Sequence, residues 1–255
     1  KGLRIGLSPD YFRILFPDAT SGEYSSKHLP VEIEQAVLHA AEVFKSLGAE
    51  IVENVPMPNT RFGIPAFFVI SRVEAASNLH RYDGVKYGYR TLKPAADLSV
   101  MYRLTRGEAF GLQPKLRILM GMYVSSAQYS EQFYRRALQV RAMMRSDFDA
   151  IFDPQGNYRL DALLAPTTPT TAFPFKAIYG DSVLMQYADQ LTVPANHAGN
   201  PALSLPAGLD AAKLPIGIQL LGADFSEPLL FRLGYAYEEA TKDEPWRRQK
   251  PGILV

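Results

Sequence analysis

One arginine lies where its charge could do chemistry. Arg117 falls inside the run Leu116–Met120, whose other members are all apolar. An unpaired buried charge is costly, so an arginine in this setting needs an acidic partner or ligand, and its planar guanidinium suits a carboxylate. Alternatively, the stem packs on apolar neighbours while the head group reaches solvent. These residues alone leave both interpretations open.

A second group of polar residues lies near the C-terminal end. Asp189 precedes an apolar run, where it could either cap the turn before Pro194 or face a pocket. The segment Asn196–Pro201 combines asparagine, histidine, glycine and proline between apolar runs. Glycine there permits tight turns and close approach of the backbone. This segment is therefore a candidate for a binding loop as well as for a structural turn.

The common catalytic motifs are missing. The four histidines, His28, His39, His80 and His197, are scattered, and none adjoins a nucleophile motif. G-x-S-x-G, H-E-x-x-H, the phosphate loop and G-x-G-x-x-G do not occur. The sequence has no cysteine, which excludes disulfides, thiolate zinc sites and a cysteine nucleophile. From its residues alone, the chain shows no self-contained catalytic machinery and no metal site.

The elements that must position these residues begin with an α/β unit. Residues 3–7 form a short apolar run that ends at a Ser-Pro-Asp turn and predicts a buried strand. Apolar residues at helical spacing then predict a helix from Pro30 to Gly48, and residues 50–55 alternate like a second strand. Strand, helix and strand in this order indicate an α/β fold.

The middle of the chain is predicted to be helical. Four segments carry the pattern: 66–80, 98–106, 114–125 and 130–152. In the last segment the apolar residues share one face, and four arginines lie mostly off it. We expect these arginines to form a solvated face and not an RNA site. They are Arg135, Arg136, Arg141 and Arg145.

The C-terminal part returns to strands. Residues 162–165 read as a short buried strand, and the prolines in Pro166–Thr171 should prevent regular pairing after it. Residues 203–205 and 216–221 are expected to be strands joined by a loop, and residues 225–240 a closing amphipathic helix. The predicted fold class is therefore α/β.

Composition limits the class of protein. The chain has 255 residues, 47% hydrophobic and 21% charged, which is typical of a globular protein with one large domain or two small ones. With a formal net charge of +1, the chain has no strong positive field that would attract nucleic acid or an anionic membrane. No apolar run approaches the roughly 20 residues of a membrane helix. Because a core strand already begins at the third residue, we expect a truncated chain.

Several sequence blocks resemble the amidase-signature family over nearly the whole chain. KGLRIGLSPDYF at the N-terminus, EAASNLHRYDGVKYGYR at residues 74–90 and RGEAFGLQPKLRILMGMYVSSAQY at residues 106–129 are most similar to the A subunits of tRNA-dependent amidotransferases. LLAPTTPTTAF, LTVPANHAGNPALSLPAG and LPIGIQLLG are shared more widely among amidases. The blocks are specific when taken together.

The resemblance implies a layered α/β/α fold with a mixed sheet, of which residues 1–255 would be the C-terminal portion of a single amidase domain. Members of this family hydrolyse amides with a Lys-Ser-Ser triad inside a glycine- and serine-rich block. No such block occurs here, so the N-terminal catalytic half is expected to be absent. No catalytic residue is assigned to this chain.

The resemblance also implies a substrate-binding role for three residues. Arg117 corresponds to the arginine that binds the carboxylate of glutamine, and Asp189 to the acidic residue that binds its α-amino group. Phe67 stands where the family often has a pocket tyrosine, so a hydroxyl contact would be lost. A guanidinium and a carboxylate can together bind the two charged groups of an α-amino acid, its carboxylate and its ammonium group.

The expected function follows from these residues. The complete subunit would hydrolyse glutamine and supply ammonia for the transamidation of Glu-tRNA(Gln) or Asp-tRNA(Asn). Its partners would be the missing N-terminal half and the B and C subunits, with tRNA met only through the complex and no membrane. ATP and Mg²⁺ are expected on the partner subunit, with no cofactor in this chain. The expected location is the cytoplasm or an organellar matrix.

Two other interpretations stay open. The chain could belong to another amidase-signature hydrolase that acts on small or aryl amides, which Phe67 favours slightly. It could instead be a truncated, non-catalytic binding or assembly module. The chain alone is expected to have no amidase activity and to expose apolar surface where its other half would pack.

Overall fold

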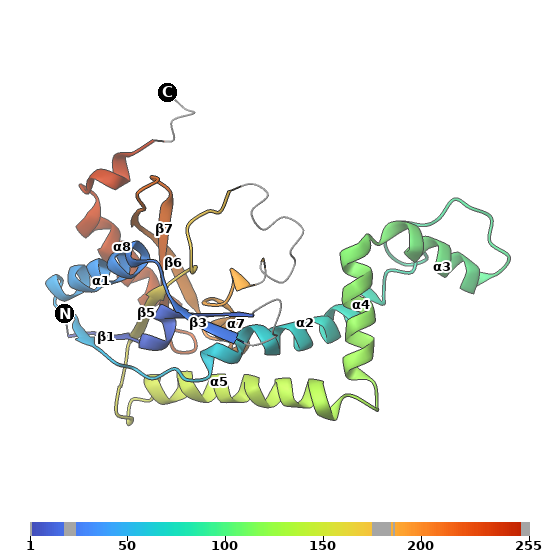
Figure 1. Cartoon of the computed structure of the whole chain (residues 1–255), viewed down its shortest axis with the longest axis horizontal. Helices are drawn as coiled ribbons and strands as arrows, with labels where there is room; N and C mark the ends of the chain where they lie inside the picture. Colours follow the sequence, from blue (N-terminus) through green and yellow to red (C-terminus); the bar gives the residue numbers. More distant parts are fainter. Residues whose placement is uncertain (1, 18–23, 175–184, 186, 251–255) are drawn as a thin grey trace. The chain divides into compact units, whose positions relative to one another are not determined.

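A computed structural model describes residues 2–17, 24–174, 185 and 187–250 (Figure 1). The chain divides into two compact units. The first combines Lys1–Ile64 with Arg141–Val255, and the second is Pro65–Val140. Two helices, α2 (Gly63–Leu79) and α5 (Arg136–Phe152), run across the boundaries between the units. Each unit is described by itself.

The first unit is built on a five-stranded mixed sheet with the order β4-β1-β5-β7-β6. β1 pairs in parallel with β4 and β5, whereas β7 pairs antiparallel with β5 and β6. Every residue of β5 is buried, so both faces of this central strand are covered. The predicted α/β class with a mixed sheet is therefore confirmed. The strands are β1 (Arg4–Leu7), β4 (Glu50–Val52), β5 (Ala162–Pro166), β6 (Ala202–Leu209) and β7 (Pro215–Leu221).

Two helices, α1 (Val31–Ser46) and α8 (Glu227–Thr241), pack against each other and against this sheet. The rings of Phe44 and Tyr237 join them, with centroids 5.5 Å apart. Both were predicted, although each begins one or two residues later than expected. Pro30 has an extended backbone and caps α1 from outside the helix. Phe225 has a positive φ of 59°, which a helix does not allow, so α8 begins after it.

Three features of the first unit were missed or misjudged from the sequence. A hairpin of β2 (Arg13–Pro17) and β3 (Tyr24–His28) lies between β1 and α1. A short helix, α7 (Val193–Ala198), occupies the region read as turns. Pro166 pairs with Ile218 inside the sheet, which contradicts the prediction of irregular chain. It is tolerated because the ladder of β5 with β1 already ends at Leu164.

The second unit is helical, as predicted. It contains most of α2, then α3 (Leu98–Ala109) and α4 (Leu112–Ser125). The predicted long helix at residues 130–152 instead opens with a π-helical turn, Glu131–Arg135, before α5 begins. Among the described residues, none of the helices has both the length and the apolar character that crossing a membrane requires.

The four arginines near α5 behave differently from one another. Arg135 and Arg136 are exposed, as expected for a solvated face, and Arg135 forms a surface pair with Glu131 at 2.6 Å. Arg141 and Arg145 are not simply solvated. Arg141 donates to the carbonyl of His197 at 2.9 Å, and Arg145 to that of Ala198 at 3.1 Å. Both cations thus bind the C-terminal end of α7, where the helix dipole favours positive charge.

Candidate functional site

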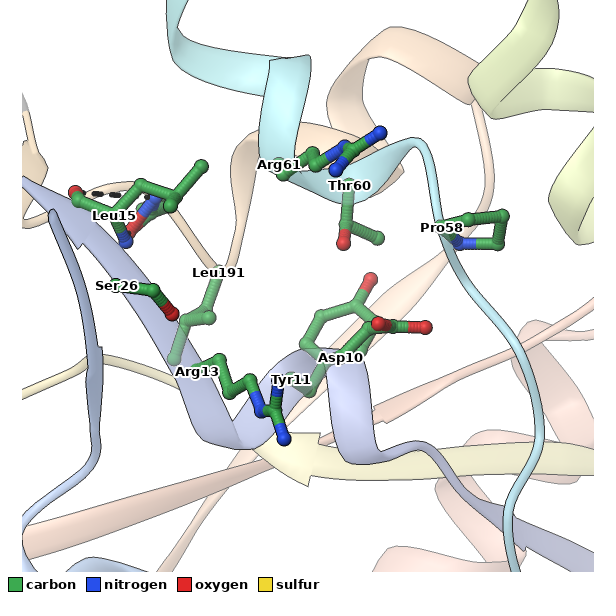
Figure 2. A pocket seen from close by; sticks show the side chains of 10 residues that line it. Asp10, Tyr11, Arg13, Leu15, Ser26, Pro58, Thr60, Arg61 and Leu191 are labelled. Carbon is green, nitrogen blue, oxygen red and sulfur yellow. Dashed lines mark hydrogen bonds between the residues drawn. The ribbon is translucent and has the colours of Figure 1, made fainter. Parts of the chain in front are cut away.

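The first unit contains a cavity of about 270 Å³ with both polar and apolar walls, shown in Figure 2. Its walls come from three parts of the chain that are distant in sequence: the turn before β2 with the hairpin, the segment before α2, and the segment before α7. The lining residues are Asp10, Tyr11, Arg13, Leu15, Ser26, Pro58, Thr60, Arg61, Gln190 and Leu191.

A short 3₁₀ turn, Pro9–Phe12, supplies the acidic side of this cavity. Ser8 caps the turn, since its hydroxyl accepts a hydrogen bond from the backbone N–H of Asp10 at 3.2 Å. Asp10 Oδ2 in turn accepts from the backbone N–H of Met57 at 2.7 Å. This bond holds the Asp10 carboxylate in one orientation and ties the turn to the segment before α2.

The same segment is anchored from α5. Asp147 accepts two hydrogen bonds from Asn59, one from the backbone at 3.0 Å and one from the side-chain amide at 2.9 Å. Burial raises the pKa of the Asp147 carboxyl, and the nearby charge of Asp10 raises it further. The two hydrogen bonds from Asn59 lower this pKa, but their effect is smaller than that of burial. Thr60 donates to the carbonyl of Met57 at 2.9 Å. The wall is therefore fixed by several bonds.

Gln190 forms the opposite wall. Its side chain is buried and bonds to the backbone of β2 as a neighbouring strand would. The amide oxygen accepts from the N–H of Leu15 at 3.0 Å, and the amide nitrogen donates to the carbonyl of Leu15 at 3.5 Å. Leu191 is also buried beside it. The segment that carries Asp189 is thereby attached to the hairpin.

The charges of the cavity are two guanidinium groups and one carboxylate, from Arg13, Arg61 and Asp10. Figure 2 shows Arg61 above and Arg13 below the cavity in this view, with the Asp10 carboxylate to one side, toward Pro58. The buried hydroxyl of Tyr11 has no hydrogen-bond partner in the described part of the chain. Burial raises the pKa of this hydroxyl far above its usual range. The arrangement suits the binding of a small charged molecule. Sequence reasoning missed this site, because only the fold brings its residues together.

The structure resolves one alternative for Asp189. Its main-chain carbonyl, and not its carboxylate, caps the turn, accepting from the backbone N–H groups of Thr192 and Val193 and from the Thr192 hydroxyl, each at 3.0 Å. The side chain is exposed, yet partial desolvation raises the pKa of its carboxyl group. Asp189 directly precedes Gln190 of the cavity wall.

Arg117 and Phe67 lie in the second unit, both half-buried. Arg117 is on α4, one helical turn before Gly121. At Gly121 α4 contacts α2 so closely that an added Cβ would clash with the carbonyl oxygen of Arg72. Burial lowers the pKa of Arg72 to about 10, and the charge of Arg117 contributes in the same direction. The sequence did not suggest this second arginine. Because Asp189 belongs to the first unit, its joint site with Arg117 and Phe67 stays a prediction.

The Asn196–Pro201 segment is held by structural contacts. Gly199 ends α7 with a positive φ of 85°, a conformation that favours glycine. The ring of His197 lies 3.2 Å from the carbonyl of Gly63, and Asn200 donates to the carbonyl of Gly222 at 2.9 Å. A second cavity of about 300 Å³ adjoins this segment, where Asn196 and Asn200 line it together with Ser204. In the described residues, no group of three or more histidine, aspartate or glutamate side chains could hold a metal ion.

Comparisons with known proteins agree with this architecture. The A subunit of the glutamyl-tRNA(Gln) amidotransferase of Cyanothece sp. is 42% identical over 251 residues, which are 96% of this chain and 50% of that protein. Its namesake in Staphylococcus aureus is 42% identical over 216 residues, 85% of this chain and 43% of that protein. The chain thus spans about half the length of the curated relatives it matches.

Solved structures share the fold. The A subunit of the glutamyl-tRNA(Gln) amidotransferase from Thermotoga maritima has a TM-score of 0.63 at 24% identity, over 94% of this chain and 42% of that one. A bacterial aryl acylamidase has a TM-score of 0.59 at 22% identity, over 96% and 45% of the two chains. The model of the family described as Amidase matches residues 19–231. The chain therefore belongs to the amidase family.

Proposed function

We propose that the chain is the C-terminal half of the glutamine-hydrolysing subunit of a tRNA-dependent amidotransferase. The observation that carries this proposal is the 42% identity, over 96% of the chain, to the A subunit of the glutamyl-tRNA(Gln) amidotransferase of Cyanothece sp.. In this proposal residues 1–255 are part of one amidase domain, and the Lys-Ser-Ser triad lies in the other half.

The chain would provide the wall of the glutamine pocket. Arg117 would bind the α-carboxylate of glutamine and Asp189 its α-ammonium group, because each presents the opposite charge. Phe67 would contact the apolar part of the substrate without the hydrogen bond that a tyrosine would add. Desolvation already raises the pKa of Asp189. A bound ammonium group would stabilise its ionised form. These contacts hold the side-chain amide against the triad, which is a positioning effect.

The partners follow from the same proposal. Ammonia released from glutamine would pass to a partner subunit that holds ATP and Mg²⁺, and the B and C subunits would bring the misacylated tRNA. This chain would meet tRNA only through that complex, in the cytoplasm or an organellar matrix. By itself it would be inactive, because it lacks the triad. Measurable glutamine hydrolysis by the purified 255-residue protein would contradict this assignment.

The direct test is glutamine hydrolysis by the full-length subunit. Arg117→Ala and Asp189→Ala should each raise KM for glutamine about tenfold or more, because each removes a charge-assisted hydrogen bond worth about 1.5–3 kcal/mol. The matched control is Arg103→Ala, an exposed arginine on α3 of the same unit, which should leave KM unchanged. An unaltered KM in Arg117→Ala would remove the basis for the pocket assignment.

A second candidate is an amidase that acts on small or aryl amides. The observation that favours it is Phe67, since an apolar ring in the pocket suits an apolar substrate. The discriminating experiment compares glutamine with an anilide as substrates of the full-length protein and of Phe67→Tyr. A preference for the anilide that Phe67→Tyr reduces would support this candidate. A preference for glutamine, together with copurification of partner subunits, would exclude it.

A further inference from the structure

The charges around the 270 Å³ cavity are arranged for a ligand that carries both signs. Asp10, Arg13 and Arg61 come from three separate segments: the 3₁₀ turn before β2, the first residue of β2, and the turn before α2. Neither arginine forms an ion pair with a carboxylate of the described residues. Two cations and one anion in one opening leave a net positive charge there.

The three residues are constrained to different degrees. Met57 fixes one oxygen of Asp10, and the other oxygen makes no hydrogen bond within the described part of the chain. The guanidinium of Arg61 lies over the ring of Phe62, 4.6 Å from its centroid, which limits its freedom. Arg13 pairs with His28 in the hairpin ladder, so its backbone is fixed as well. Both arginine side chains are exposed, so a ligand would have to order them when it binds, whereas the carboxylate of Asp10 is already oriented.

The size of the cavity limits the occupant. A volume of about 270 Å³ falls just below the ~300–1,000 Å³ that is usual for pockets of drug-sized ligands. A single amino acid fits this limit. A simple anion such as phosphate would match the two arginines, but the Asp10 carboxylate would repel it. The carboxylate is satisfied only if the ligand also carries a cation.

We propose that this cavity binds an acidic α-amino acid, with Asp10 receiving the ammonium group and Arg13 and Arg61 receiving the two carboxylates. Its net charge of −1 complements the net positive charge of the opening. The hydroxyls of Ser26 and Thr60 add polar contacts at the walls. The choice of L-glutamate as the ligand rests on the proposed function, because glutamate is the product of glutamine hydrolysis and would be released close to Asp189.

Calorimetric titration of the 255-residue protein with three matched ligands tests this proposal. L-Glutamate presents both carboxylates and the ammonium group, glutarate lacks the ammonium group, and L-glutamine lacks the second carboxylate. We expect L-glutamate to bind at least tenfold more tightly than either of the others. Equal or tighter binding of glutarate would overturn the role of Asp10, and absence of heat with L-glutamate would overturn the site.

Variants assign the contacts. Arg13→Met and Arg61→Met keep the length of the stem and should each weaken L-glutamate binding at least tenfold. Asp10→Asn keeps an acceptor for Met57 and should abolish the preference for L-glutamate over glutarate. Arg232→Met, which changes an exposed arginine on α8, is the control and should bind as the unmodified protein does. Thermal melts show whether each variant is folded. Unchanged binding in folded Arg13→Met and Arg61→Met would refute the proposal.

The same titration separates this inference from the proposed function. Arg117→Met should leave L-glutamate binding unchanged if the cavity is the site. If Arg117→Met abolishes binding while Arg13→Met does not, then L-glutamate occupies the proposed glutamine wall and the cavity proposal fails. Conversely, cavity binding together with an unaltered KM in Arg117→Ala would uphold this site and refute the glutamine wall.

Discussion

At the scale of single residues, two buried tyrosine hydroxyl groups of the first unit bear on stability. The hydroxyls of Tyr11 and Tyr237 are both buried, and neither has a hydrogen-bond partner among the described residues. Burial raises the pKa of Tyr237 to about 12, and the charge of Glu244 adds to this effect. A buried donor without a partner costs about 1–3 kcal/mol. These two hydroxyls are therefore places where stability can be gained.

Tyr11→Phe should leave the free energy of unfolding unchanged or raise it by about 1 kcal/mol, because it removes an unsatisfied hydroxyl and keeps the ring. Tyr237→Phe should behave in the same way. Tyr11→Ala is the contrasting variant and should cost about 3–5 kcal/mol, since it empties a fully packed site. Urea unfolding measures all three. A loss of more than about 1 kcal/mol in Tyr11→Phe would mean that the hydroxyl has a bonding role.

Asp147 should make stability depend on pH. Its folded-state pKa is raised above 3.8, first by burial and then by Asp10. The folded protein therefore binds this proton more tightly than the unfolded chain does. The resulting stabilisation is fully present below the unfolded pKa and is lost as the pH rises through the folded pKa. The unfolding free energy of the unmodified protein minus that of Asp147→Asn should thus fall as pH rises through this window.

NMR titration of the Asp147 carboxyl carbon provides the second measurement. Asp10→Asn should lower the pKa of Asp147, because it removes the negative charge that Asp10 contributes. Glu50→Gln, an exposed change on β4, is the control and should leave that pKa unchanged. A pKa of Asp147 below 3.8 in the unmodified protein would contradict the sign of the predicted pH dependence.

At the scale of elements, the second unit depends on one close helix crossing. A Cβ added to Gly121 of α4 would clash with the carbonyl oxygen of Arg72 and would lie 2.8 Å from the Cβ of Ala76, both on α2. The first neighbour is backbone, which cannot move aside without separating the helices. Gly121→Ala should therefore destabilise the second unit by about 1–3 kcal/mol or more, as overpacking does.

Gly107→Ala is the matched control for this crossing. Gly107 lies within α3, and a Cβ there would meet nothing within 4 Å. Because alanine favours a helix over glycine, the change should stabilise the unit by about 0.5–1 kcal/mol. Circular dichroism during thermal unfolding reports both effects. Equal behaviour of the two variants would show that α2 and α4 do not meet at Gly121.

The contact between α5 and α7 also depends on one side chain. Arg145 binds both carboxylate oxygens of Asp224, at 2.9 and 2.7 Å, in addition to the end of α7. Arg145→Ala should therefore cost about 1 kcal/mol, allowing for its partial exposure to solvent. Arg135→Ala, which breaks only an exposed pair, should cost less in the same urea unfolding experiment. If the two variants lose equal unfolding free energy, the contacts of Arg145 add no stability and both arginines belong to a solvated face, as predicted.

Elements were predictable from the sequence where one local pattern determined them. The apolar runs of β1 and β5 and the helical spacing of α1 and α8 carry their own signal. The β2–β3 hairpin was missed because the side chain of Gln190, 175 residues from Leu15, completes its edge. Pro194 and Gly199 suggested a turn, but Pro194 lies in the first turn of the six-residue helix α7 and Gly199 ends that helix. The cavity could not be predicted, because its walls come from three distant segments.

At the scale of the whole molecule, the two units differ in how much apolar surface they bury. All of Pro65–Val140 is described, and only four apolar side chains are buried there: Ala66, Ile70, Met101 and Ala137. Many large apolar side chains of the same unit are exposed instead, among them Leu92 at 94% and Leu112 at 72%. Burial of apolar side chains is the main source of stability. The second unit should therefore open more readily than the sheet of the first.

Hydrogen exchange measures this difference directly. Amides of α3 and α4 should exchange much faster than those of β5 and β7, because local opening costs less where few apolar contacts are broken. If the chain is half of an amidase domain, the full-length subunit should slow exchange over the exposed apolar residues of α4, such as Leu119 and Met122, where the other half would cover them. The amides of β5 are fully buried already and serve as the internal control. Equal exchange in the chain and in the full-length subunit would mean that the apolar face of α4 is not a contact with the other half.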